Sequence, residues 1–337
     1  MIEFFYDYGL FLLKVLTVAG AVGALLVGVI TASRDSSSRS EGSLTVETLN
    51  DKYRRMANKV RQAVLSKADW KQSEKEQKKA AKAAEKNTDE ARKRIFVLDF
   101  KGDLRASGVE SLRQEVTAVI AVARPDDEVV VCLENAGGAV QDHGLGASQL
   151  QRIKDHGLPL TVIVDKVAAS GGYLMACIAD RLVAAPFAII GSIGVLAQLP
   201  NFNRFLEQRG VDFEQVTAGR YKRTLTMFGK NTEADREKTR EELEEVHQLF
   251  KAAVSEHRPT LDMERVATGE HWYGTRALEL GLIDELGSSD DYLMQAAEQA
   301  GIYAVSYKQR EGLAGKLQSA LTSTAEALGL GPRYPWS

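Results

Sequence analysis

The stretch "DKVAASGGYLMACIAD", residues 165–180, follows directly on the apolar run "LPLTVIV", residues 158–164. A run of small residues with one serine, Ser170, therefore stands where a buried strand ends and a helical pattern begins. Glycine lets the backbone turn sharply and come close to another segment. The pattern fits either a tight strand-to-helix turn whose serine caps the helix, or a turn that presents a hydroxyl to a substrate.

Apolar strands alternate with helical patterns on both sides of this turn. Almost continuous apolar runs, as expected when both faces of a sheet are covered, predict strands at 94–100, 128–134 and 160–165. Helical spacing lies between and after them, and a further short strand, "RLVAAP", begins at residue 181. This alternation predicts an α/β domain with a parallel sheet and right-handed crossovers.

The sequence changes character from residue 232. Thr232 with Asp235 has the spacing of a helix N-cap arrangement, and a long charged helix follows until Pro259. One face of this helix carries Leu243, Val246, Phe250 and Val254. We expect it to act as an arm that packs on another surface, such as a neighbouring subunit.

The amino-terminal residues 10–32 are apolar and long enough to cross a hydrocarbon core of about 30 Å as a helix. Only Lys14 interrupts them. A cleaved signal peptide is the alternative, but its start would be basic, whereas "MIEFFYDYG" is acidic. Because basic residues follow this segment, the positive-inside rule favours a cytoplasmic position for the rest of the chain.

Four segments are predicted along the chain. They are a membrane anchor at 1–32, a polar linker with a Lys/Glu/Ala-rich stalk at 33–93, a catalytic domain at 94–311 and a tail at 312–337. The stalk has high helix propensity and a basic excess. It fits equally a contact with anionic lipid headgroups or a plain spacer.

The composition excludes little by itself, since the 337 residues carry a net charge of only -3. Cys132 and Cys177 both lie in apolar segments and are expected to be buried. Neither a Cys/His cluster with metal-ligand spacing, nor a P-loop, nor a dinucleotide-binding glycine pattern is present in the sequence. We therefore expect no metal, no cofactor and no nucleic-acid partner.

A second glycine pair, Gly137 and Gly138 in "LENAGGAV", ends another predicted strand. Active sites in open α/β sheets lie beyond the carboxyl ends of the strands, so the two glycine turns can flank one pocket. Their amide groups, on either side of the Ser170 hydroxyl, would form an oxyanion hole. The serine also needs a base. His143 lies nearby in sequence but is interpreted as a helix-start residue, whereas Lys222 can act as a base if burial lowers its pKa.

The ordered motifs "ENAGG", "DKVAASGGY", "APFAIIGSIGV", "GRYKRTLT" and "GEHWYGTRALELGLIDELG" resemble the signal peptide peptidase A family, in particular its short membrane-anchored bacterial members. The likeness covers essentially the whole chain. It implies a ClpP/crotonase-like fold and a Ser–Lys dyad that works without histidine or metal. On this resemblance, Ser170 is the nucleophile and Lys222 the general base and acid.

The same resemblance implies that Gly138 and Gly171 supply the oxyanion hole, with Gly137 as the alternative to Gly138. It also implies that Ser192 supports the lysine; a simple turn serine is the other interpretation. Relatives usually have Ser-Pro before the glycine pair, where this chain has Asn135 and Ala136. Since proline presets the turn, its absence is expected to loosen this loop.

The resemblance implies a membrane-anchored serine endopeptidase of the bacterial inner membrane. Its expected substrates are signal-peptide remnants or other membrane-derived polypeptides. It would form a homo-oligomer with active sites near subunit interfaces, so that serine and lysine can come from different chains. Two alternatives stay open: a non-catalytic membrane scaffold on a protease fold, and a crotonase-type acyl-CoA enzyme that would use Glu134.

Overall fold

The computed structural model describes residues 9, 13–17, 20, 42–86 and 92–309. Residues 45–306 form one compact unit, and residues 1–44 with 307–337 form a second. In the described part of the second unit, the Gly42 amide donates to the Tyr307 hydroxyl at 2.8 Å. The elements that position a site all belong to the first unit.

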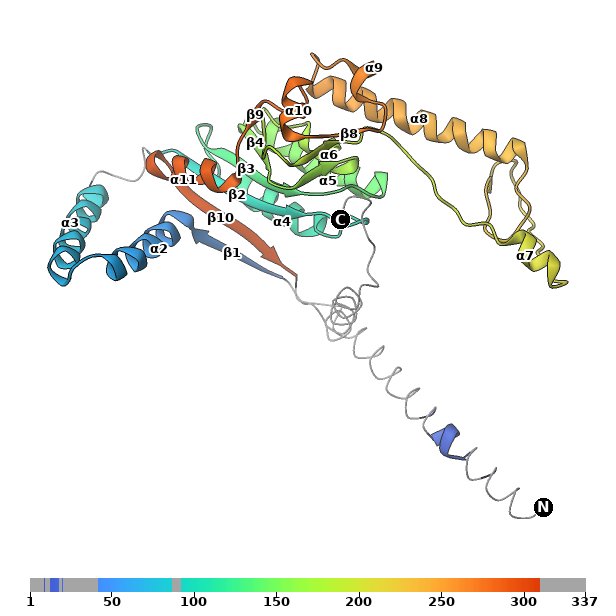
Figure 1. The fold of residues 1–337 in the computed structure, drawn as a ribbon, viewed down its shortest axis with the longest axis horizontal. Coiled ribbons are helices and arrows are strands. Elements are labelled where there is room, and N and C mark those ends of the chain that lie inside the picture. Colours follow the sequence, from blue (N-terminus) through green and yellow to red (C-terminus); the bar gives the residue numbers. More distant parts are fainter. Residues whose placement is uncertain (1–8, 10–12, 18–19, 21–41, 87–91, 310–337) are drawn as a thin grey trace. The chain divides into compact units, whose positions relative to one another are not determined.

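A seven-stranded sheet with the order β1-β10-β2-β3-β4-β6-β9 lies at the centre of the first unit (Figure 1). From β10 to β9 each neighbouring pair runs parallel. The strands are β1 (Ser43–Thr48), β2 (Arg94–Lys101), β3 (Glu128–Glu134), β4 (Leu160–Val164), β6 (Arg181–Ala184), β9 (Glu285–Leu286) and β10 (Gly301–Lys308). The predicted α/β organisation with a large, mostly parallel sheet is confirmed.

Helices separate most of these strands in the chain, as the alternating pattern predicts. They are α2 (Leu49–Val64), α3 (Lys67–Lys86), α4 (Val109–Ile120), α5 (Val140–Asp155), α6 (Gly171–Ala176), α7 (Asn203–Gln208), α8 (Glu233–His257), α9 (Met263–Val266), α10 (Gly274–Glu279) and α11 (Ser289–Gln299).

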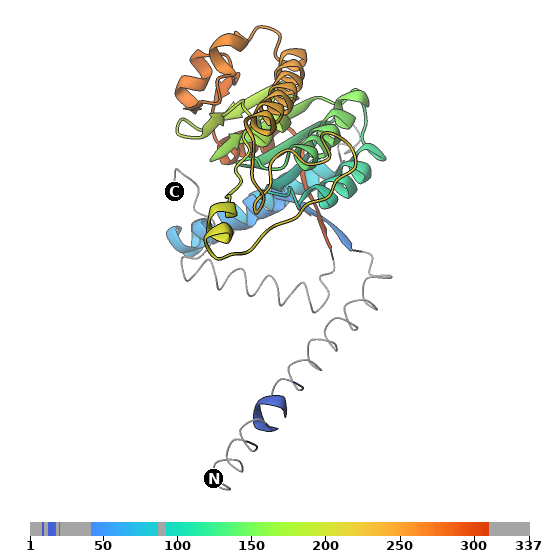
Figure 2. The same ribbon diagram turned by 90° about the vertical axis from the view of Figure 1, so that its right-hand side faces the viewer.

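Both faces of the sheet are covered, which explains its continuous apolar strands. In β2, Phe96 and Leu98 belong to one hydrophobic cluster, whereas Ile95 and Val97 belong to another. α4 and α5 pack side by side against the first face (Figures 1 and 2). α11 and the first turn of α2 contribute to the second cluster. Because side chains alternate along a strand, covering both faces requires apolar residues at every position.

A small three-stranded sheet holds the serine turn. Its strands are β5 (Val167–Ala169), β7 (Ile189–Gly191) and β8 (His271–Tyr273). β5 and β7 run parallel and pair Ala169 with Gly191. A single bridge between Asn135 and Ala168 joins this sheet to the end of β3. The turns that follow β3, β5 and β7 are thereby brought to one edge.

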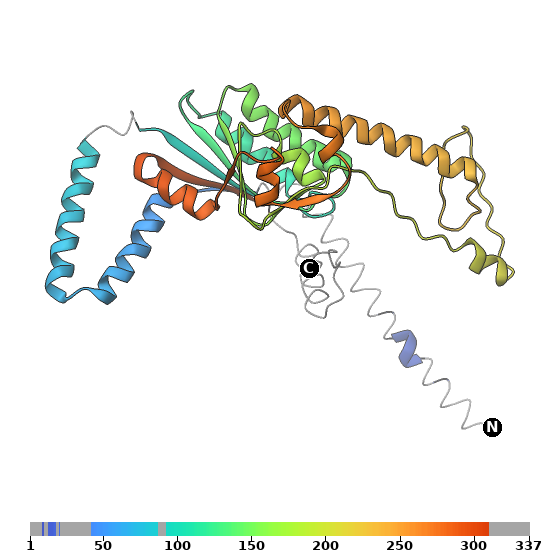
Figure 3. The same ribbon diagram turned by 45° about the horizontal axis from the view of Figure 1, so that its top comes forward.

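The long helix α8 begins as the sequence predicts. Thr232 and Asp235 form a reciprocal capping box at its start, and the helix ends two residues before Pro259. Within α8 only Phe250 and Val254 are buried, both near its carboxyl end. The amino-terminal part of α8 therefore projects from the core, and the segment between α7 and α8 lies at its outer end (Figures 1 and 3).

The predicted membrane helix at 10–32 lies outside the described residues except for 13–17 and 20. Within the described ranges, the structure contains no helix of the length and apolar character that a bilayer crossing requires. The predicted tail at 312–337 also lies outside the described residues. The boundary predicted at 93/94 stays a prediction.

The segment predicted as linker and stalk contains a strand that the sequence analysis missed. β1 pairs with β10 at the edge of the large sheet, and α2 and α3 follow it. Five of the six residues of β1 are exposed, so the strand shows no burial pattern. Its position comes from backbone pairing with β10, which single-sequence periodicity does not report.

Candidate active site

Ser170 occupies the N-cap of α6 but does not cap it. Its backbone has φ 51° and ψ −121°, and its side chain accepts no hydrogen bond from the helix. Among the described residues its hydroxyl has no hydrogen-bond partner, while its amide donates to the Gly191 carbonyl at 2.8 Å. A positive φ is uncommon for a residue with a side chain and costs about 1–3 kcal/mol. The turn therefore holds the serine in a strained conformation with an uncommitted hydroxyl.

The loops after β3 and β5 approach each other too closely for side chains. A Cβ on Gly137, whose φ is 90°, would lie 2.8 Å from the Ser170 Cβ and from the Gly171 amide nitrogen. A Cβ on Gly172 would lie 2.0 Å from the Asn135 carbonyl oxygen. Glycine is therefore required in both motifs for the same reason, because the backbones of the two loops are in direct contact.

The hydrogen bonds distinguish Gly137 from Gly138, the two glycines between which the sequence did not decide. The Gly137 amide donates to Asn135 Oδ1 at 2.9 Å. Within the described part of the chain, the amides of Gly138 and Gly171 have no hydrogen-bond acceptor. Gly171 is the first residue of α6, where an amide has no partner inside the helix. Gly138 and Gly171 therefore keep donors that a ligand can use.

Asn135 holds the loop that the missing proline was expected to loosen. Its side chain is buried, and Oδ1 both accepts from the Gly137 amide and lies 3.2 Å from His143 Nε2. This is an Asx-type turn, in which an asparagine side chain replaces a backbone contact two residues on. The Asn135 side chain thus ties down a turn that proline would preset, while the expected loosening of this loop stays a prediction.

His143 packs directly under the serine turn. It lies in the first turns of α5, is fully buried, and its Nδ1 is 2.9 Å from the Ala139 carbonyl oxygen. A Cβ on Gly171 would approach the ring to 2.5 Å. The interpretation as a helix-start residue gives its place in α5 but misses this contact. The signal in the sequence was the Asn135–Gly137 spacing of an Asx turn, which fixes the loop around the ring.

Ser192 lies beside Ser170 at the same edge. It follows β7 as Ser170 follows β5, and the preceding residues, Ala169 and Gly191, are register partners. Neighbouring strands are about 4.8 Å apart. Ser192 also has a positive φ, 53°, and its amide donates to the Glu270 carbonyl at 2.7 Å. The structure thus brings Ser170, Gly138, Gly171 and Ser192 to one place.

Lys222 is not part of this cluster within one chain. It lies in the connecting segment, residues 209–232, and its side chain is exposed. Its ammonium makes no hydrogen bond or ion pair with the residues that the structure describes. The connecting segment lies at the outer end of α8, whereas α6 lies against the sheet (Figures 1 and 3).

Two cysteines and Glu134, the other reactive side chains considered from sequence, are at least partly buried or paired outside this cluster. Burial raises the pKa of both Cys132 and Cys177 to about 12, so these free thiols stay protonated. The expectation that they are buried small residues is confirmed for Cys177, whereas Cys132 is only partly buried. Glu134, the residue that an acyl-CoA enzyme would use, bonds Lys166 at 3.1 Å.

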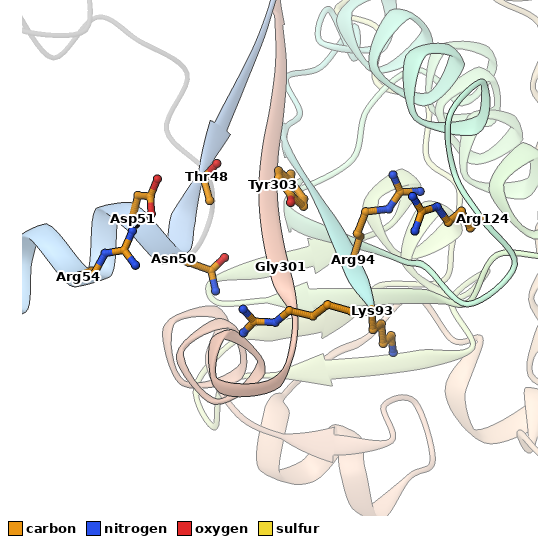
Figure 4. A pocket seen from close by; sticks show the side chains of 10 residues that line it. Thr48, Asn50, Asp51, Arg54, Lys93, Arg94, Arg124, Gly301 and Tyr303 are labelled. Carbon is orange, nitrogen blue, oxygen red and sulfur yellow. Dashed lines mark hydrogen bonds and ion pairs between the residues drawn. The ribbon is translucent and has the colours of Figure 1, made fainter. Parts of the chain in front are cut away.

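A cavity of about 380 Å³ lies at the opposite edge of the sheet, where β2 and β10 begin (Figure 4). Ser170 does not line it. Because parallel strands place their carboxyl ends together, this cavity and the serine turn lie at different edges.

The chain matches two family descriptions in succession. Residues 3–150 match "Peptidase family S49 N-terminal", and residues 152–303 match "Peptidase family S49". Together with the relatives below, these matches show that the chain belongs to peptidase family S49. The resemblance found in the motifs is confirmed.

Relatives described as "Probable protease SohB" resemble the chain over most of its length. The one from Haemophilus influenzae is 43% identical over 320 residues, covering 92% of this chain and 90% of its own. One from Buchnera aphidicola subsp. Schlechtendalia chinensis is 43% identical, covering 87% and 99%. Another, from Buchnera aphidicola subsp. Acyrthosiphon pisum, is 52% identical, covering 68% and 69%.

Proposed function

We propose that this chain is a membrane-anchored serine endopeptidase with a ClpP/crotonase-like catalytic domain. Ser170 is the nucleophile and Lys222 is its base. The observation that carries this proposal is the strained turn at Ser170, whose hydroxyl is uncommitted and which packs against the loop of Gly137 and Gly138. Among the described residues, the amides of Gly138 and Gly171 have no acceptor. Strained residues of this kind concentrate at active sites, and a serine on a sharp strand-to-helix turn is a recurring nucleophile geometry.

The reaction follows from these positions. Neutral Lys222 accepts the proton of Ser170 Oγ, and the oxygen attacks the carbonyl carbon of a peptide bond. The Gly138 and Gly171 amides donate to the oxyanion of the tetrahedral intermediate. Lys222 then protonates the leaving amine, and water hydrolyses the acyl-enzyme with the lysine again acting as base.

We further propose that Lys222 reaches Ser170 from a neighbouring copy of the chain. The connecting segment exposes several apolar side chains although it holds no core of its own. They are Val211, Phe213, Val216, Tyr221, Met227 and Phe228. Contact with another copy would bury them and would remove Lys222 from water, which a neutral lysine base requires. Ser192, beside Ser170, would then hold the incoming ammonium.

The membrane part of the proposal comes from sequence. Residues 10–32 anchor the chain in the bacterial inner membrane by one span, and the basic residues that follow favour a cytoplasmic catalytic domain. A tethered peptidase meets substrates that leave the bilayer, so signal-peptide remnants and membrane-protein fragments are the proposed substrates.

Cleavage of an unstructured peptide by purified variants tests this proposal. We expect Ser170→Ala and Lys222→Ala each to lower kcat/KM by at least about a thousandfold, because the dyad acts as a unit. Lys230→Ala, an exposed lysine on the same segment, is the control and keeps its activity. A fluorophosphonate should label Ser170 stoichiometrically. Near-normal activity of Lys222→Ala would refute the dyad, and absence of labelling would favour the scaffold alternative.

A further inference from the structure

α2 carries an apolar stripe that the protein covers only at its first turn. Leu49 is 7% exposed and Tyr53 packs partly against the second core cluster. Farther along the same face, Met56 is 58%, Val60 62% and Val64 72% exposed. These five residues recur every three or four positions and so form one continuous face of the helix.

No neighbouring element closes over the exposed part of this stripe. α3 starts at Lys67 after a short turn and diverges from α2 instead of packing along it (Figure 3). α11 meets α2 near its start, where Asn50 donates to the Ala297 and Ala300 carbonyls. Two turns of apolar surface thus stand uncovered by any described residue.

Positive charges border the stripe on both sides. At 100° per residue, Lys52 and Lys59 fall along one border, and Arg54 and Arg61 fall toward the other. All four side chains are exposed. Of these four cations, only Arg54 has a carboxylate partner among the described residues; this partner is Asp51, which lies on the polar face.

The pocket beside the amino-terminal end of α2 adds to this positive charge. Its lining includes Arg54, Arg92, Lys93, Arg94 and Arg124, against the one carboxylate of Asp51 (Figure 4). Asp51 pairs with Arg54, and two carboxylates just outside the lining pair with Arg94 and Lys93. Arg92 keeps its positive charge there, because its guanidinium donates to the backbone carbonyls of Ala297 and Gln299. The surface around α2 therefore attracts an anionic partner.

We propose that α2 lies in the surface of an anionic lipid bilayer, with Met56, Val60 and Val64 among the headgroups and the bordering cations on lipid phosphates. A narrow apolar face between cations, on a helix of low net hydrophobicity, is the pattern of an interfacial helix. A second protein chain is a poorer occupant. Three aliphatic side chains supply far less than the roughly 1,000 Å² that a specific protein interface needs. This contact is separate from the proposed span at 10–32 and from the peptidase chemistry.

A fluorescent label on the stripe tests the contact. The full chain with Val64→Cys is labelled with an environment-sensitive dye and reconstituted into vesicles of phosphatidylcholine alone or mixed with phosphatidylglycerol. The unsubstituted chain, in which Cys177 is buried and Cys132 is partly buried, is treated with the dye in parallel and gives the contribution of the native thiols. We expect a blue-shifted emission and quenching by spin-labelled lipid in the mixed vesicles, and a weaker effect in phosphatidylcholine. A dye at Gln62→Cys, on the polar face, should show the emission of a water-exposed dye in both kinds of vesicle.

A matched pair of charge variants separates the stripe from the rest of the helix. In the Val64→Cys background, Val60→Glu should abolish the lipid-dependent shift, whereas Gln62→Glu should keep most of it. Both introduce the same residue two positions apart. The proposal is overturned if the Val64 label reports water in every lipid, if both faces shift alike, or if the shift appears without lipid and so reports a second copy of the chain.

Discussion

The conformation of Ser170 is the most informative single feature of the molecule. The Ser170 amide bonds Gly191 and its carbonyl accepts from the Leu174 amide at 3.0 Å, so both sides of the residue are fixed. A capping serine accepts a hydrogen bond from an amide in the first turn of the helix, but the Ser170 side chain accepts none. The surrounding hydrogen bonds thus offset a strained φ of 51° and leave the hydroxyl available.

Removing the side chain should release this strain. Ser170→Gly and Ser170→Ala both lack the nucleophile, and glycine adopts a positive φ without steric cost. We expect Ser170→Gly to unfold at a higher temperature than Ser170→Ala, although glycine loses about 0.5–1 kcal/mol through its unfolded-state entropy. Calorimetry on the two inactive variants measures the difference. A less stable glycine variant would show that the turn is not strained.

The contact between Gly137 and the serine turn predicts a loss of activity without a general loss of fold. A Cβ at Gly137 meets backbone at 2.8 Å, so Gly137→Ala must displace the turn. Gly157→Ala is the control: its φ is also positive, 73°, but nothing lies within 4 Å of its Cβ. Both should lose about 1 kcal/mol from backbone strain, Gly137→Ala should lose more because of its steric contact, and only Gly137→Ala should lose kcat strongly. Equal kcat values for the two would contradict the account.

The sequence predicts which residues belong to this site better than it predicts their contacts. The position of Ser170 between strand and helix follows from periodicity, and the glycine pairs follow from their place at strand ends. The approach of Gly172 to the Asn135 carbonyl joins residues that are 37 positions apart, and the packing of His143 under Gly171 joins residues that are 28 positions apart. Such contacts depend on the register between β3 and β5, which local patterns do not contain.

At the scale of the elements, β2 and β3 are joined at their starts by a buried ion pair. Arg94 Nε donates to both carboxylate oxygens of Asp127 at 3.0 and 3.1 Å, and the Arg124 amide donates at 2.7 Å. Burial alone raises the pKa of Asp127, but these hydrogen bonds outweigh it and hold the pKa below its ordinary value. The carboxylate therefore stabilises the fold while it is ionised.

The sign of this effect gives a pH prediction. A lowered pKa means that the contribution is complete above the ordinary carboxyl range and is lost as the pH falls through the folded-state value. The free energy of unfolding should thus fall below about pH 4, and Asp127→Asn should be less stable at neutral pH and lose less on acidification. Asp126→Asn, its exposed neighbour, is the control. Parallel pH profiles for wild type and Asp127→Asn would contradict this assignment.

Elements with a strong local signal were predictable, and those built by pairing were not. The capping box at Thr232 and the stop before Pro259 fix the two ends of α8, and both are visible in the sequence. β1 lacks a buried face and takes its place from β10. Tertiary pairing, rather than propensity, decides such an edge strand.

At the scale of the whole molecule, one chain leaves the proposed site incomplete. Ser170 and its amide donors are assembled against the sheet, while Lys222 stands exposed on a segment beyond the projecting part of α8. The family resemblance predicts both residues from sequence. It does not say from which chain the lysine comes, because that depends on the assembly and on a surface that no local pattern describes.

Mixing two inactive variants tests the central claim most directly. Ser170→Ala keeps Lys222, and Lys222→Ala keeps Ser170, so an oligomer built from both contains intact dyads only if each dyad spans two chains. We predict that differently tagged variants, co-expressed and purified through both tags in sequence, recover measurable peptide cleavage, while each alone stays inactive. Mixed oligomers that carry both tags and cleave nothing would contradict a dyad shared between chains.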